Sequence, residues 1–170
     1  MLFIIFGLPG AGKSYLGNVL QKTFGFFHYD GDDALPMNMK KILIKGERIT
    51  NRQRSIFFNK LLQQIKKISA YHKRIAVSQT FIKEQYRLLF AKHFPKITFL
   101  LIHTDTLIRE KRLARRKIFP LKKRYQHTMS LMFEPPRIAH LIINNNAPGK
   151  KMLITQLQTI LPSLNNMLVD

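Results

Sequence analysis

Short apolar runs recur along the chain, separated by longer segments in which apolar residues return every three or four positions. Short continuous runs are typical of buried strands, and the longer periodic segments are typical of amphipathic helices. The expected strands are Leu2–Phe6, Phe26–Tyr29, Ile75–Ser78, Ile97–His103 and Ile138–Ile143. The expected helices are Lys13–Phe24, Thr50–His72, Lys83–Phe94, Thr106–Lys117, Tyr125–Phe133 and Lys150–Leu168, and Pro162 is expected to end or kink the last one.

The alternation of strands and helices predicts an α/β fold with three layers: a central five-stranded parallel sheet and helices on both of its faces. The 170 residues show no repeat or linker, so residues 1–170 are expected to form a single domain. In open parallel sheets, ligands bind beyond the carboxyl ends of the strands. The segments expected to meet there are Gly7–Ser14, Asp30–Asp33, Gln79-Thr80, Thr104-Asp105 and Asn144–Ala147.

The segment Gly7–Ser14 follows the first strand and reads Gly-Leu-Pro-Gly-Ala-Gly-Lys-Ser, which fits the phosphate-binding pattern G-x-x-x-x-G-K-[ST]. Glycines let several backbone amides turn toward phosphate oxygens, and the dipole of the following helix adds positive potential. Lys13 is expected to reach the outer phosphates and Ser14 to bind Mg²⁺. The alternative is an ordinary glycine-rich turn, which would not account for the apolar strand before the segment or the amphipathic helix after it. The expected ATP-binding residues here are Gly7, Gly10, Ala11, Gly12, Lys13, Ser14 and Tyr15.

Charge and composition narrow the function classes. Lysine and arginine total 29 against 9 acidic residues, a net charge of +20, which predicts attraction to anionic substrates or polyanions. The absence of cysteine excludes disulfides, thiolate metal sites and cysteine nucleophiles, so a metal is expected to be oxygen-bound. No apolar run approaches the length of a membrane span, and a cytoplasmic protein is expected.

Three of the nine acidic residues fall together in Asp30-Gly31-Asp32-Asp33. Residues two apart in an extended segment point to the same side, so Asp30 and Asp32 are both expected to face the phosphate loop. We expect Asp30 to hold Mg²⁺ through water and Asp32 to act on the acceptor hydroxyl. The alternative is that these side chains cap a following helix, above all Asp33.

Nine of the sixteen residues from Arg109 to Arg124 are lysine or arginine. A mobile basic lid at about residues 117–124, closing over a triphosphate, explains this density, although a solvated helix face explains part of it. Arg112 and Arg116, four residues apart, are expected to contact phosphate, with Arg116 acting in catalysis. Arg54, Lys83 and Arg87 are expected near the acceptor; either arginine could instead be a surface charge. Tyr86 lies between Lys83 and Arg87 in the sequence and is expected in the same region.

These residues resemble the gluconate kinase family of small P-loop sugar-acid kinases, from Phe3 to about Pro148. The segment Thr80–Arg87 matches the family pattern at Lys83, Tyr86 and Arg87. Further matches are Asp30-Gly31-Asp32, Gly46, Arg54, the lid pattern Arg112–Pro120 and Phe133-Glu134-Pro135. The sequence departs from the family at Leu35 and Phe119, where the family has His, and at Asn51 and Gln53, where it has Asp.

The resemblance implies a kinase that uses ATP and Mg²⁺, frequent homodimers, and adenine held near Arg112 and the Asn146-Ala147-Pro148 turn. We therefore expect phosphoryl transfer to a hydroxyl of a small sugar acid, with D-gluconate as the best single candidate. Arg54, Lys83 and Arg87 would hold the substrate carboxylate. Two alternatives stay open: a kinase of nucleotides or nucleic-acid ends, motivated by the net charge but lacking an RNA-binding motif, and an ATP-binding regulator without turnover.

Overall fold

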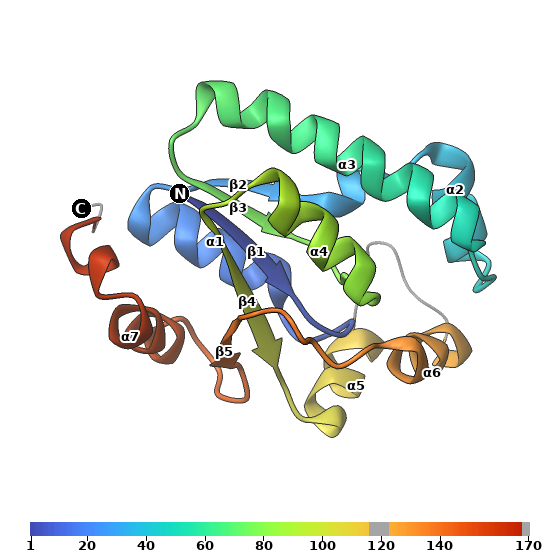
Figure 1. The fold of residues 1–170 in the computed structure, drawn as a ribbon. Helices are drawn as coiled ribbons and strands as arrows, with labels where there is room; N and C mark the ends of the chain where they lie inside the picture. The colour runs from blue at the N-terminus through green and yellow to red at the C-terminus, as the bar shows by residue number, and fades with distance from the viewer. Residues whose placement is uncertain (116–122, 168–170) are drawn as a thin grey trace.

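The sheet lies at the centre of the fold, with helices on both faces (Figure 1). The structure is a computed structural model that describes residues 1–115 and 123–167. Within these residues five parallel strands pair in the order β2-β3-β1-β4-β5. Their bounds are β1 Leu2–Phe6, β2 Phe27–Asp30, β3 Ile75–Ser78, β4 Ile97–His103 and β5 Leu141–Asn144. The expected five-stranded parallel sheet is confirmed.

The last strand begins later than expected. The amide of Ile138 donates to the Glu84 carboxylate at 2.7 Å, so Ile138 is held outside the sheet ladder and β5 starts at Leu141. In a longer strand the Ile138 amide would bond to the neighbouring strand, but here it bonds to the Glu84 side chain instead.

Seven α-helices and two short 3₁₀ helices lie in the described part of the chain, six of the α-helices close to their expected positions. The α-helices are α1 Lys13–Phe24, α2 Met37–Ile44, α3 Asn51–Tyr71, α4 Glu84–His93, α5 Thr106–Ala114, α6 Lys123–Met132 and α7 Lys151–Ile160. The 3₁₀ helices are η1 Gly31–Ala34 and η2 Pro162–Met167. Helix α7 ends before Pro162, as predicted, but the residues after it form η2 rather than a continued helix.

Helix α2 was not expected. It has eight residues, of which only Met39 and Leu43 are buried, so its buried face is a single pair four residues apart. One such pair is too short a repeat to distinguish a helix from a loop.

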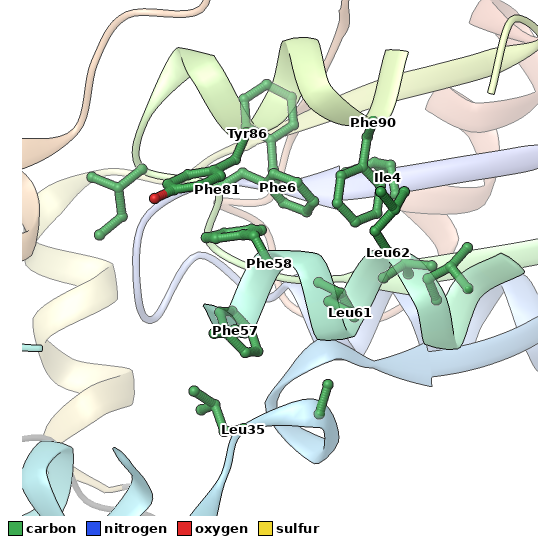
Figure 2. Packing of buried hydrophobic residues seen from close by; sticks show 14 of the residues in the cluster. Ile4, Phe6, Leu35, Phe57, Phe58, Leu61, Leu62, Phe81, Tyr86 and Phe90 are labelled. Carbon is green, nitrogen blue, oxygen red and sulfur yellow. The ribbon is translucent and has the colours of Figure 1, made fainter. Parts of the chain in front are cut away.

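The apolar core is divided between the two faces of the sheet. Strand β1 is buried along its whole length, and alternate residues point to opposite faces. Ile4 and Phe6 pack with residues of α3 and α4, as Figure 2 shows. Phe3 and Ile5 pack with residues of α1 and α7. Because both faces are covered, the strand reads as an unbroken apolar run.

The carboxyl ends of the parallel strands lie at one edge of the sheet, where α5 and α6 also lie (Figure 1). The register pairs Asp30 with Ser78, and Ser78 with Ile5, so the polar residues that follow β2 and β3 lie next to the loop that follows β1. The predicted meeting of the five segments at this edge follows from the register. No helix in the described parts of the chain is long and apolar enough to cross a membrane.

Candidate active site

The loop between β1 and α1 has a backbone shape that only glycine accommodates at three positions. Gly7, Gly10 and Gly12 have φ of 143°, 80° and 99°. A Cβ at Gly12 would lie 2.2 Å from Asn145 Nδ2, and one at Gly10 would lie 2.7 Å from the carbonyl oxygen of Arg109. The glycines predicted for tight turning therefore also allow neighbouring segments to approach closely. The resulting loop fits the amide cradle that a polyphosphate requires.

The loop is anchored through the carbonyl of Ala11. This oxygen accepts from Thr104 Oγ1 at 2.9 Å and from Asn145 Nδ2 at 2.7 Å, so the residues that follow β4 and β5 hold it in place. Arg112 adds a contact from Nη1 to the same carbonyl at 3.4 Å and donates from Nη2 to the Asn145 carbonyl at 2.9 Å. Sequence reasoning placed Thr104 and Asn145 at this edge but assigned them no role. The signal that marks them is a polar side chain directly after a buried strand.

Lys13 and Tyr15 occupy the start of α1. The ammonium of Lys13 donates to the carbonyls of Gly7 and Leu8, both at 3.1 Å, so it lies folded over the loop. Both side chains line the cavity described below, and Tyr15 is 44% exposed. A lysine in this position brings its charge to the place where phosphate oxygens would bind.

Ser14 and Asp30 form a pair of oxygen donors beside the loop. Ser14 Oγ donates to Asp30 Oδ2 at 2.7 Å, and Asp30 Oδ1 accepts from the backbone amide of Asp32 at 3.1 Å. A hydroxyl and a carboxylate suit Mg²⁺, which keeps several water and phosphate ligands rather than a full protein cage. In the described residues, no group of three or more His, Cys, Asp or Glu side chains is placed to hold a metal ion without other ligands. Asp30 also caps η1, so the capping anticipated above all for Asp33 falls to Asp30.

Asp32 lines the cavity and is oriented by Gln79. Gln79 Nε2 donates to Asp32 Oδ1 at 3.0 Å, while Gln79 Oε1 accepts from the amide of Thr80 at 2.6 Å. Both ends of the Gln79 amide are therefore fixed, and Gln79 is 8% exposed. A carboxylate held in one orientation is suited to accept a proton from a bound hydroxyl. Like Thr104 and Asn145, Gln79 was placed at this edge from the sequence but was assigned no role.

A cavity of about 450 Å³ extends from the phosphate loop to α3, which is within the usual size of small-molecule sites. Its polar end holds Lys13, Ser14, Asp30, Asp32 and Arg112. Its apolar wall is built of side chains from α2, α3 and α6, from the short segments on either side of α2, and from the segment after β3. These are Leu35, Leu43, Ile49, Phe57, Phe58, Phe81, Ile82 and Met129.

Arg54 lies in the apolar wall of this cavity. The side chain is 6% exposed, and its Nε has no hydrogen-bond partner in the described part of the chain. Burying a guanidinium nitrogen without a partner is costly, and a ligand, an ion or a water molecule can supply the partner. The geometry thus places Arg54 where an anionic group of a bound molecule would meet it.

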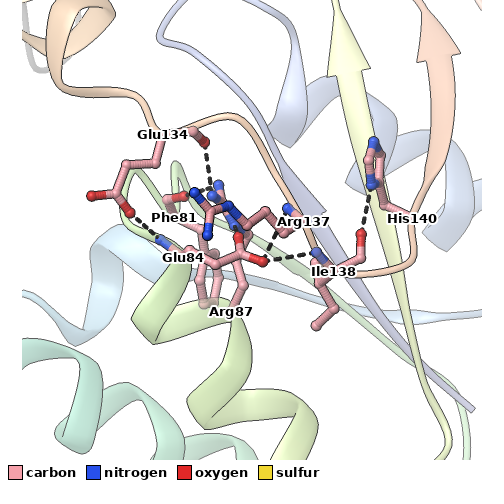
Figure 3. A network of polar contacts seen from close by, with 7 residues as sticks. All are labelled: Phe81, Glu84, Arg87, Glu134, Arg137, Ile138 and His140. Atoms are coloured by element: carbon pink, nitrogen blue, oxygen red, sulfur yellow. Dashed lines mark hydrogen bonds and ion pairs between the residues drawn. The ribbon is translucent and has the colours of Figure 1, made fainter.

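Lys83 and Arg87 do not line the cavity, which corrects the expectation that they hold the substrate carboxylate. Arg87 is fully buried, donates from Nη1 to the Phe81 carbonyl at 2.8 Å and from Nη2 to the Glu134 carbonyl at 2.7 Å, and pairs through Nε with Glu84 (Figure 3). Lys83 pairs with Glu134 at 2.9 Å. The Glu84 amide, together with the Lys83 ammonium, lowers the pKa of Glu134. These residues join α4 to the segment before β5.

The remaining predicted residues lie elsewhere. Arg116, Phe119 and most of the proposed lid at 117–124 fall outside the described residues. Pro148 is exposed and does not line the cavity. Gln53 reaches back to the amide of Thr50 at 2.8 Å in the capping box of α3, which gives it a local structural role.

Comparison with known proteins finds gluconokinases both among curated proteins and among solved structures. No family model matches the sequence. A probable gluconokinase of Xenopus tropicalis is 23% identical over 151 residues, spanning 80% of each chain. The solved gluconokinase of Sinorhizobium meliloti 1021 has a TM-score of 0.78 at 20% identity, covering 96% of this chain and 93% of that one. A shikimate kinase of Acinetobacter baumannii, solved with shikimate, has a TM-score of 0.65 at 16% identity over 95% and 93% of the two chains. The gluconate-kinase resemblance and the P-loop kinase fold are both confirmed.

Proposed function

We propose that this protein is a kinase that transfers the γ-phosphoryl group of ATP to a hydroxyl of a small sugar acid or related hydroxy acid. The observation that carries the proposal is that one cavity is lined at one end by the phosphate loop, beside it by Asp32, and in its far wall by Arg54. The gluconokinase relatives support the same reaction class.

In the proposed reaction, the loop amides and Lys13 would bind the β- and γ-phosphates. Ser14 and Asp30 would hold Mg²⁺, which when bound neutralises part of the phosphate charge. Arg54 would bind the anionic group of the acceptor and so present its hydroxyl to Asp32. The acceptor oxygen forms a bond to the γ-phosphorus, the bond from that phosphorus to the β,γ-bridging oxygen breaks, and ADP leaves with the electron pair. The hydroxyl proton passes to Asp32.

The test is ATP consumption, followed as ADP release, across a panel of sugar acids, simpler hydroxy acids and uncharged polyols. The proposal predicts acid-dependent ADP release that exceeds the rate with polyols. ADP release independent of any acceptor, or none at all, would contradict it.

The net charge of +20 motivates one rival, a kinase of nucleic-acid ends or nucleotides. That rival predicts phosphate transfer to an oligonucleotide 5′ end, together with binding that weakens steeply with salt. The same assay run with a 5′-hydroxyl oligonucleotide as acceptor distinguishes the two, because a kinase of small acids would release no ADP in response to the oligonucleotide.

A further inference from the structure

The wall of the cavity that faces away from the phosphate loop offers few hydrogen bonds to an acceptor. Leu35, Phe57, Phe58 and Phe81 line it and are 0–7% exposed. Their rings support one another: the centroids of Phe58 and Phe81 lie 4.9 Å apart, as do those of Phe57 and Phe58. Figure 2 shows the three rings and Leu35 gathered on this side of β1. Mutual packing fixes the wall before a ligand arrives.

Several polar side chains at the edge of this wall already have protein partners. Gln79 uses both ends of its amide on Asp32 and Thr80. Ser78 Oγ lies 3.0 Å from His28 Nε2. A hydroxyl of a bound molecule directed toward this wall would therefore meet mostly carbon.

A polyhydroxylated acid is a poor match for such a wall. Each hydroxyl buried without a partner costs about 1–3 kcal/mol. Gluconate carries five hydroxyl groups, of which one would be phosphorylated, so the others would need partners. By contrast, an apolar or aromatic body gains free energy from contact with Phe57, Phe58 and Leu35.

Among the described residues, one cation lies within this apolar wall. Arg54 is 6% exposed, its Nε has no partner in the described part of the chain, and neither of the ion pairs found in that part involves it. Carboxylate is the group that a guanidinium binds best in two-point geometry. Besides the phosphate loop, the cavity thus combines a cation at Arg54, a carboxylate at Asp32 and an apolar lining.

We infer that the acceptor is a small hydroxy acid with one carboxylate, one reactive hydroxyl and a largely apolar or flat body, rather than gluconate. The inference rests on the proposed function and specifies the substrate class of the same cavity. The carboxylate binds Arg54, the hydroxyl is phosphorylated beside Asp32, and the body packs against the ring wall.

A matched acceptor series tests this directly on the full chain with ATP and Mg²⁺. D-Gluconate and 6-hydroxyhexanoate have the same six-carbon chain, carboxylate and terminal hydroxyl, and differ only in the four hydroxyls between them. A third acceptor, 4-(hydroxymethyl)benzoate, is flat and rigid. We expect kcat/KM for at least one of the two less hydroxylated acids to exceed that for gluconate by about tenfold or more. Equal rates, or a preference for gluconate, would overturn the inference.

A binding measurement separates this inference from the proposed function. Calorimetry with the same acids in the presence of Mg²⁺ and a non-hydrolysable ATP analogue reports their order of affinity without turnover. If no acid is phosphorylated, the proposed phosphotransferase activity fails, but tighter binding of 4-(hydroxymethyl)benzoate than of gluconate still supports the substrate class. The reverse order, or no acid binding at all, overturns it.

Variants of Arg54 and Leu35 test which side chains of the cavity select the acceptor. Arg54→Gln should abolish the preference for 4-(hydroxymethyl)benzoate over its neutral amide, while Arg52→Gln, which removes an exposed charge from the same helix, should keep it. Leu35→Asn should narrow the difference between gluconate and 6-hydroxyhexanoate, and Leu35→Met, which stays apolar at similar volume, should preserve it. If Leu35→Asn does not fold, the wild-type acceptor series decides. Unchanged selectivity in a folded Arg54→Gln would overturn the assignment of the anion site.

Discussion

Arg87 holds the backbone of Phe81 in place by donating from Nη1 to its carbonyl oxygen at 2.8 Å. Phe81 has φ of 45°, and in the described ranges no other residue except glycine has a positive φ. A bulky residue in this region is strained by about 1–3 kcal/mol and persists only where its surroundings enforce it. Arg87 therefore acts on the cavity through Phe81, whose ring forms part of the apolar wall.

Arg87→Met should reduce the free energy of unfolding by about 3 kcal/mol, because it leaves the partly buried Glu84 without its cationic partner and leaves the Phe81 carbonyl without its donor. Urea denaturation measures this loss. Lys92→Met, which removes an exposed charge from the same helix, is the matched control and should change stability little. A similar loss in both variants would show that Arg87 is not the anchor described here.

Gly12→Ala should abolish ATP binding, since its Cβ would lie 2.2 Å from Asn145 Nδ2 and its φ of 99° is unfavourable for alanine. The matched control is Gly149→Ala, which has a similar φ of 83° but no atom within 4 Å of the new Cβ. Calorimetric titration with an ATP analogue compares the two, and the control should bind as wild type does. Retained affinity in Gly12→Ala would mean that the loop is not the nucleotide site.

Asp32→Asn should lower kcat by about 100-fold or more while leaving the KM for ATP nearly unchanged, because it removes a proton acceptor and not a nucleotide contact. Asp33→Asn removes the same charge from an exposed neighbouring position and should retain activity. Steady-state kinetics on both variants tests the assignment. Equal losses in the two would point to a general charge effect in place of a specific role for Asp32.

The stability of the fold should decrease on mild acidification because of His28. Burial lowers the pKa of His28 below its usual value of 6.5, although Asp30 and Asp33 oppose the shift. Above 6.5 the ring is neutral in both the folded and unfolded states, and below 6.5 the unfolded state takes up the proton first. The free energy of unfolding therefore falls as the pH decreases through 6.5 toward the lower folded-state pKa.

His28→Gln should flatten that dependence, since the ring that contacts Asn18 and Ser78 is replaced by a side chain that does not titrate. Thermal or urea unfolding of wild type and variant between about pH 5 and pH 8 gives the comparison. Parallel curves for the two proteins would exclude His28 as the source.

The sheet and the phosphate loop could be predicted from sequence because each depends on local pattern. The apolar run Leu2–Phe6 is buried on both faces, and the glycines of Gly7–Ser14 encode a backbone shape that few other residues adopt. The edge at which Asp30 and Asn145 meet the loop then follows from the topology of a parallel sheet.

The acceptor side could not be predicted in the same way. The motif match at Lys83 and Arg87 indicated substrate contact, but the partly buried carboxylate of Glu84 and the backbone of Glu134 bind Arg87 instead. Glu84 is only three residues from Arg87 in α4, a spacing that allows an ion pair within one helix. The Glu134 carbonyl is 47 positions away, and no local pattern in the sequence predicts that contact. Arg54 faces the cavity because α3 packs against η1, which is again a tertiary relationship. The apolar wall combines residues of α2, α3, α6 and the segment after β3, so it depends on tertiary packing and not on any local pattern.

The most direct test of the central claim is ³¹P nuclear magnetic resonance of the protein incubated with ATP, Mg²⁺ and 4-(hydroxymethyl)benzoate or a sugar acid. The account predicts that the γ-phosphate signal of ATP is replaced by ADP signals and a new phosphate monoester signal in equal amount. Release of inorganic phosphate alone, or an unchanged ATP spectrum with every acid, would contradict it.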